Sequence, residues 1–156
     1  MSTVHPNVQK LAPNLTKEFP HSPHAMVGGY VLAKRCIDKG RAELTGNLGE
    51  YHFDCPLDNI FLGFAEIKGA DLREFLATGA DDEAVGKWIT EHARKRERIE
   101  IIKWNNEWRY KRMGELPDGM QEFMEDYIPK NVPPAVIHHV RYFFDIFDAE
   151  EKRFVH

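Results

Sequence analysis

Hydrophobic residues recur along most of the chain with the period of short amphipathic helices. Leu57, Ile60, Phe61 and Phe64 follow the i, i+3, i+4, i+7 pattern of a helix that buries one face. The same period predicts further helices over residues 25–44, 70–78, 81 onward, 99–113 and 120–128. Glycine or proline separates most of these segments, as expected for helix ends.

The segment after Pro133 and Pro134 is ambiguous by pattern alone. The apolar residues between Val136 and Phe147 are dense enough to suit either a buried helix or a strand. We expect a helix that runs to about Phe144 and is followed by a tail.

The N-terminal segment has a different character, because prolines at positions 6, 13, 20 and 23 prevent regular structure from running far. We therefore expect an extended arm over residues 1–23 and a single helical domain over residues 24–156. The predicted fold class is all-α, a single irregular bundle of about seven short helices with an extended proline-containing arm.

Composition agrees with one compact domain and excludes several partners. The chain has 156 residues, of which 42% are hydrophobic and 29% charged, close to the averages of globular proteins. Its net charge of -4 argues against nucleic acid as a partner, because affinity for phosphates needs a basic excess. The basic cluster over residues 92–98 is therefore interpreted as a solvated helix end.

The cysteines and the apolar runs bear on the compartment. Cys36 and Cys55 form no CxxC pair, and no N-terminal apolar run resembles a signal peptide, so we expect free thiols and a cytoplasmic location. No apolar stretch approaches the roughly 18 to 20 residues of a membrane span, so no membrane partner is expected.

Residues 28–58 hold the richest set of chemically useful side chains around turns that could bring them together. The predicted catalytic residues are Asp38 and Glu50 as general bases and Tyr51 as a proton donor. The predicted ligand-binding residues are Tyr30, Arg35, Lys39, Cys55 and Asp58, with the two cations as anchors for an anionic group. No spacing rule shows that these residues converge, and a purely structural charge network is the alternative.

No cofactor or metal is predicted from the motifs. The glycines at 28 and 29 match neither the dinucleotide-binding pattern nor the P-loop, which needs Gly-Lys-Ser/Thr. The histidine pairs 21/24 and 138/139 match no zinc spacing, and adjacent histidines on a helix diverge by about 100°.

Four short motifs in fixed order carry a resemblance to a known family. They are Gly28-Gly29-Tyr30, Ile37-Asp38-Lys39-Gly40-Arg41-Ala42, Gly49-Glu50-Tyr51 and Cys55-Pro56-Leu57-Asp58. Together they resemble a bacterial family of small proteins classified as a domain of unknown function, with the series GGY, IDKARA, GEY and CPLD. Gly40 stands where that family usually has alanine. The resemblance implies a soluble bacterial protein and supplies no reaction.

Three functions remain open at this point. The leading hypothesis is a helical pocket that binds a small polar or anionic molecule and performs cofactor-independent acid–base chemistry as a lyase, isomerase or hydrolase. The second is a non-enzymatic module that recruits another protein or a second copy of the chain as a homodimer. The third is a metal-dependent enzyme that uses His52, His138 or His139.

Overall fold

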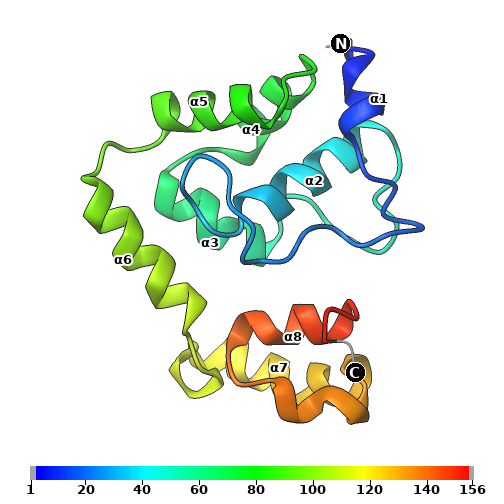
Figure 1. Cartoon of the computed structure of the whole chain (residues 1–156), viewed down its shortest axis with the longest axis vertical. Helices are drawn as coiled ribbons and strands as arrows, with labels where there is room; N and C mark the ends of the chain where they lie inside the picture. The colour runs from blue at the N-terminus through cyan, green and yellow to red at the C-terminus, as the bar shows by residue number, and fades with distance from the viewer. Residues whose placement is uncertain (1–2, 155–156) are drawn as a thin grey trace. The chain divides into compact units, whose positions relative to one another are not determined.

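The computed structural model describes residues 3–154, which form helices and connecting loops (Figure 1). Seven α-helices in this part of the chain have eight or more residues: α2 (Ala33–Leu44), α3 (Pro56–Ala65), α4 (Gly69–Leu76), α5 (Asp82–His92), α6 (Arg98–Arg109), α7 (Asp118–Asn131) and α8 (Phe143–Glu150). Shorter elements are α1 (Asn7–Leu11) and the 3-10 helices η1 (Met113–Glu115) and η2 (Pro134–His139). The predicted all-α class with about seven short helices is confirmed.

The chain divides into two compact units, which we call unit 1 (Met1–Ile101) and unit 2 (Ile102–His156). The division falls inside α6, and each unit has its own helices and its own buried side chains. The expectation of a single helical domain over residues 24–156 stays a prediction.

Helix α2 lies at the centre of unit 1, where it packs against α1, α3 and α4 (Figure 1). Gly40 lies close to α4, because a Cβ atom there would lie 2.7 Å from Leu76 Cδ1. A larger residue would have to displace that buried side chain. The absence of a side chain at Gly40 therefore allows α2 to pack closely against α4.

The start of α2 differs from the prediction of a helix over residues 25–44. Gly28, Gly29 and Leu32 have φ angles of 64°, 88° and 70°, in the left-handed region that a right-handed helix cannot contain. Residues 25–32 form turns instead, and an isolated β-bridge joins Val27 to Tyr30. The helix begins at Ala33, and the predicted start was wrong.

The N-terminal arm is anchored on unit 1 and contains the short helix α1. The N–H of His5 donates to the carbonyl of Ala77 at 2.8 Å, and the N–H of Leu15 donates to the carbonyl of Asn47 at 2.9 Å. Gly49 leaves room for this contact, since a Cβ atom there would lie 2.7 Å from the Leu15 carbonyl oxygen. The arm is thus part of the packed structure.

Unit 2 is built on α7, η2 and α8, with Phe143, Phe144 and Ile146 buried in its core. The predicted helix to about Phe144 was wrong: η2 ends at His139, the chain then extends, and α8 begins at Phe143. Asp145 caps the new start, because its carboxylate accepts the N–H groups ahead of the first turn of α8.

Helix α7 also departs from its predicted limits. It was expected to end before Pro129 but continues through that residue to Asn131. Among the residues that the structure describes, no helix combines the length and the apolar character needed to cross a bilayer.

Candidate functional site

Helix α2 carries four charged side chains that are almost fully buried. Arg35, Asp38, Lys39 and Arg41 are between 1% and 3% exposed. A buried charge is stable only when a counter-charge or hydrogen bonds replace the lost water. The partners of these side chains therefore define what the centre of unit 1 can do.

Asp38 holds a histidine of the N-terminal arm. Asp38 Oδ2 lies 2.6 Å from His21 Nδ1 and also accepts the backbone N–H of His21 at 2.9 Å. Arg35 Nη1 donates to the carbonyl of His21 at 3.2 Å. Two buried residues of α2 thus fix both the backbone and the ring of His21, and we call the carboxylate and the imidazole the His21–Asp38 dyad.

The dyad presents one ring nitrogen outward. The His21 side chain is 59% exposed, whereas Asp38 is 3% exposed. Because a carboxylate can only accept hydrogen bonds, the contact with Asp38 requires the hydrogen on Nδ1, and in a neutral ring this leaves Nε2 as a proton acceptor. The structure gives Nε2 no hydrogen-bond partner among the described residues. A general base needs this arrangement of an oriented ring with an accessible lone pair.

A chain of ion pairs continues from Asp38 along the same face of α2. Lys34 Nζ lies 3.3 Å from Asp38 Oδ1 and 2.8 Å from Asp82 Oδ2, and Arg41 Nη1 lies 2.7 Å from Asp82 Oδ1. Burial of Asp82, the largest influence, acts to raise the pKa, but hydrogen bonds from Lys34 and Arg41 outweigh it and lower the pKa of Asp82. Asp82 therefore stays ionised and joins α5 to α2.

A second group of side chains surrounds Lys39. Its Nζ lies 2.8 Å from Asp58 Oδ1 and 3.3 Å from Cys55 Sγ. Asp58 Oδ2 accepts the backbone N–H of Asp54 at 2.9 Å, so both oxygens of this buried carboxylate are used. Cys55 is half-buried at the N-cap of α3. The structure thus brings together three of the predicted ligand-binding residues.

The other predicted residues are distributed differently. Tyr30 packs against Phe61 and Phe64, and its burial raises the pKa of the phenol, an effect that the charge of Arg96 partly offsets. Tyr51 lies against Arg35, whose guanidinium carbon is 5.6 Å from the ring centroid.

Glu50 is exposed in the loop between α2 and α3. It was paired with Asp38 as a candidate base, but only Asp38 lies at the centre of unit 1. The two carboxylates thus differ in surroundings.

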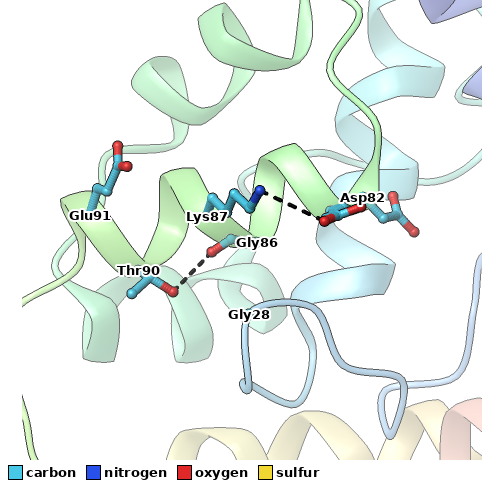
Figure 2. Close-up of a pocket in the computed structure, with 7 residues that line it drawn as sticks. Gly28, Asp82, Gly86, Lys87, Thr90 and Glu91 are labelled. Atoms are coloured by element: carbon cyan, nitrogen blue, oxygen red, sulfur yellow. Dashed lines mark hydrogen bonds and ion pairs between the residues drawn. The ribbon is translucent and has the colours of Figure 1, made fainter.

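A surface depression of about 450 Å³ lies along α5, and none of the predicted site residues lines it (Figure 2). It is lined by Gly28, Asp82, Glu83, Gly86, Lys87, Thr90 and Glu91. Two of its polar side chains have partners within α5, since Lys87 pairs with Glu83 at 3.7 Å and Thr90 Oγ1 donates to the carbonyl of Gly86 at 3.0 Å. Asp82 is its link to the ion pairs of α2.

The histidines of the metal hypothesis lie in different units. His52 is exposed in the loop between α2 and α3 of unit 1, whereas His138 and His139 end η2 of unit 2, with ring centroids 4.1 Å apart. Within either unit taken alone, no three His, Cys, Asp or Glu side chains of the described chain lie close enough to share a metal ion.

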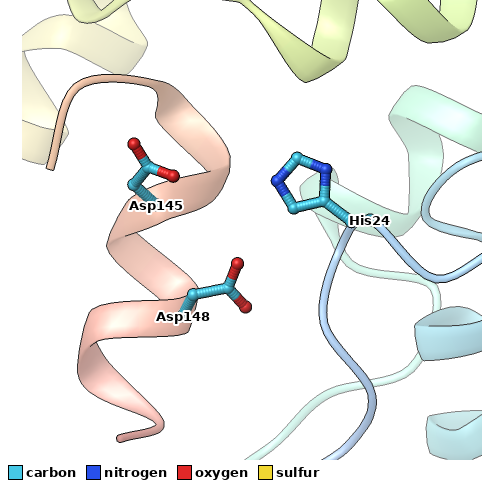
Figure 3. Close-up of side chains that lie close together, drawn as sticks. All are labelled: His24, Asp145 and Asp148. Atoms are coloured by element: carbon cyan, nitrogen blue, oxygen red, sulfur yellow. The ribbon is translucent and has the colours of Figure 1, made fainter. Parts of the chain in front are cut away.

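Two aspartates on one side of α8, Asp145 and Asp148, are labelled in Figure 3 together with His24 of unit 1. Asp145 accepts the N–H of Tyr142 at 2.9 Å, and Asp148 accepts a hydrogen bond from Arg153 at 3.1 Å. Both carboxylates thus have a role inside unit 2, one as a helix cap and one as an ion pair.

Sequence reasoning considered His21 only as a metal ligand and missed its role beside Asp38. The two residues are 17 positions apart and belong to different elements, so no local period relates them. The available signal was indirect: a histidine held between Pro20 and Pro23 has few conformations to lose when it docks.

Comparison with known proteins identifies a family. The model of a family described as "Domain of unknown function (DUF5069)" matches residues 17–153. No curated protein matches the chain. The matched range includes the dyad and the residues around Lys39.

Proposed function

The chain belongs to the DUF5069 family, and from this premise we propose that unit 1 performs general acid–base chemistry on a small polar or anionic molecule at the His21–Asp38 dyad. The observation that carries the proposal is the 2.6 Å contact between a buried carboxylate and an exposed imidazole. It supports a cofactor-independent lyase, isomerase or hydrolase, because a proton is moved by the side chains themselves.

His21 Nε2 would be the atom that touches the substrate. It takes a proton from a substrate C–H, O–H or bound water and returns it to the product or leaving group. Asp38 is a positioning residue: it keeps the hydrogen on Nδ1 and stabilises the imidazolium that forms. Because His21 is held by three hydrogen bonds, little conformational freedom has to be lost before proton transfer.

The charges around the dyad favour an anionic ligand. Lys34 forms ion pairs with both Asp38 and Asp82, and its side chain is 17% exposed, so a ligand beside the dyad can approach this cation. A positive charge in a partly desolvated region attracts anions more strongly than the same charge in bulk water. Carboxylates and phosphate esters are therefore the first substrates to test.

The experiment compares the wild-type chain with His21→Gln and Asp38→Asn in a thermal-shift screen of carboxylate and phosphate metabolites. A ligand at a hundred times its dissociation constant stabilises the native state by about 2.7 kcal/mol. His52→Gln is the matched control, because His52 is an exposed histidine of the same unit. We expect a metabolite to raise the melting temperature of wild type and His52→Gln but not of His21→Gln.

Nitrogen NMR of the imidazole rings tests the mechanism without a ligand. Neutral His21 should carry its hydrogen on Nδ1, and Asp38→Asn should shift the ring toward the Nε2–H tautomer, because an amide can also donate. A wild-type His21 with its hydrogen on Nε2 would contradict the proposed base.

The alternative function is an interaction module that binds a second copy of the chain. It is favoured by the ion pairs that Lys39 and Arg41 make inside unit 1, and by the exposure of Phe19 and Met26, which are 46% and 48% exposed and flank His21 in the sequence. Light scattering separates the two functions: a dimer that Phe19→Ser dissociates, with no ligand in the screen, would favour the module.

A further inference from the structure

Cys55, Lys39 and Asp58 form a reactive group that the dyad does not use. Lys39 and Asp58 are 3% and 1% exposed, whereas Cys55 is half-buried, so Cys55 is the most solvent-accessible residue of the three. The sulfur lies 3.3 Å from the lysine nitrogen, which is 2.8 Å from the carboxylate. A thiol, an amine group and a carboxylate thus lie in sequence.

We infer that Cys55 is an oxidation site and that Lys39 captures the oxidised sulfur, forming a sulfur–nitrogen cross-link between α3 and α2. Hydrogen peroxide first oxidises the thiol to a sulfenic acid and is reduced to water. The amine of Lys39 then attacks the sulfur, the S–O bond breaks, and the hydroxyl leaves with a proton as a second water. The product is a sulfenamide, formed with the loss of two hydrogens from the protein.

Asp58 makes the lysine competent for this step. An ammonium has no lone pair, so Lys39 must first release a proton, and Asp58 Oδ1 at 2.8 Å is placed to accept it. The other oxygen of Asp58 is held by the N–H of Asp54, which fixes the carboxylate against the lysine. The separation of 3.3 Å between nitrogen and sulfur is within the range of about 3 to 3.5 Å expected for reacting atoms.

The competing reaction is a disulfide with Cys36, which lies one helical turn before Lys39 on α2. Cys36 is fully buried, and this burial raises the pKa of its thiol well above the ordinary value. Because the thiolate is the form that attacks a sulfenic acid, Cys36 is a poor competitor. The amine that already contacts Cys55 has the advantage.

The test is mass spectrometry of the full chain after treatment with dilute hydrogen peroxide. We expect a loss of about 2 Da that dithiothreitol reverses, since a thiol reductant reopens the sulfur–nitrogen bond. A disulfide between Cys36 and Cys55 would give the same mass, so Cys36→Ser is the decisive background. In that variant the loss should persist, and trypsin should no longer cleave after Lys39.

Two further variants complete the design. Cys55→Ser should abolish the mass loss of about 2 Da. Lys39→Arg should also abolish this mass loss while it keeps the positive charge. Lys87→Arg is the control, because Lys87 is an exposed lysine. The tryptic peptide map of Cys36→Ser shows directly whether Lys39 is modified, so the test remains valid even if Lys39→Arg does not fold. Loss of the signal in Cys36→Ser would overturn the proposal in favour of a disulfide. A gain of about 32 Da at Cys55, from a sulfinic acid with no cross-link, would overturn it in favour of simple oxidation.

Discussion

Lys39→Met is expected to destabilise unit 1 strongly, because it leaves the Asp58 carboxylate buried without its counter-ion. The two side chains are 3% and 2% exposed, and their charged atoms lie 2.8 Å apart. Removing one partner of a buried ion pair costs about 3 to 5 kcal/mol. Since domains have total stabilities of about 5 to 15 kcal/mol, the variant should lose a large share of its free energy of unfolding.

The double variant Lys39→Met with Asp58→Asn separates the cost of an unpaired charge from the cost of a changed shape. Asparagine keeps an oxygen for the N–H of Asp54 but carries no charge. The remaining penalty is the lost pairing, about 1 kcal/mol for a typical hydrogen bond. We therefore expect the double variant to be more stable than Lys39→Met alone.

Urea unfolding followed by circular dichroism measures these differences, and hydrogen exchange of the α2 amides assigns them to unit 1, because two units can unfold separately. Lys87→Met is the matched control: its partner Glu83 is 81% exposed, so the change should cost at most about 1 kcal/mol. If Lys39→Met proves as mild as Lys87→Met, or if the double variant is no better than the single one, the reasoning about a solvent-excluded pair is refuted.

Three other experiments test further parts of unit 1. Asp82→Asn should lower the free energy of unfolding at neutral pH by more than Lys87→Met does, because it leaves the buried guanidinium of Arg41 without its counter-ion. Because the folded pKa of Asp82 is lowered, this contribution is present above its unfolded pKa and disappears as the pH falls through the folded pKa. Urea titrations at several pH values will show this dependence. Gly49→Ala should destabilise the chain by more than about 1 kcal/mol, since φ is +61° and the new methyl group would lie 2.7 Å from the Leu15 carbonyl; a melting temperature equal to that of wild type would contradict this. Cys55 should react with an aromatic disulfide reagent in the native chain while Cys36 reacts only after unfolding, and equal rates for the two thiols would contradict the burial of Cys36.

Much of the helical framework could be predicted because local interactions determine it. Pro56 occupies the first turn of α3, and Asp81 caps α5 by accepting the N–H of Ala84 at 2.9 Å. Each of these interactions joins residues only a few positions apart, so the local sequence is sufficient to predict it. The same holds for the buried stripe of α3, where Phe61 is 0% exposed.

The predictions that failed depended on contacts between distant residues. Residues 25–32 have a helical pattern, but Gly28 packs its backbone against Gly86 of α5, where a Cβ atom on Gly28 would lie 3.3 Å from the Gly86 carbonyl. In unit 2 the backbone N–H of Phe143 donates to the carbonyl of Lys111 at 2.7 Å, which sets the start of α8. Neither contact can be recognised from the local sequence of the residues that it orders.

The sequence by itself determined which side chains were available for chemistry, and the tertiary structure alone decided how they are paired. Asp38 and Lys39 are neighbours in the chain, yet a helix turns successive side chains about 100° apart, so they face different partners. Asp38 meets His21, 17 residues earlier, and Lys39 meets Cys55, 16 residues later. Periodicity describes which face of a helix is buried, but the partner of a buried charge depends on how the helices pack, and packing is a property of the whole unit.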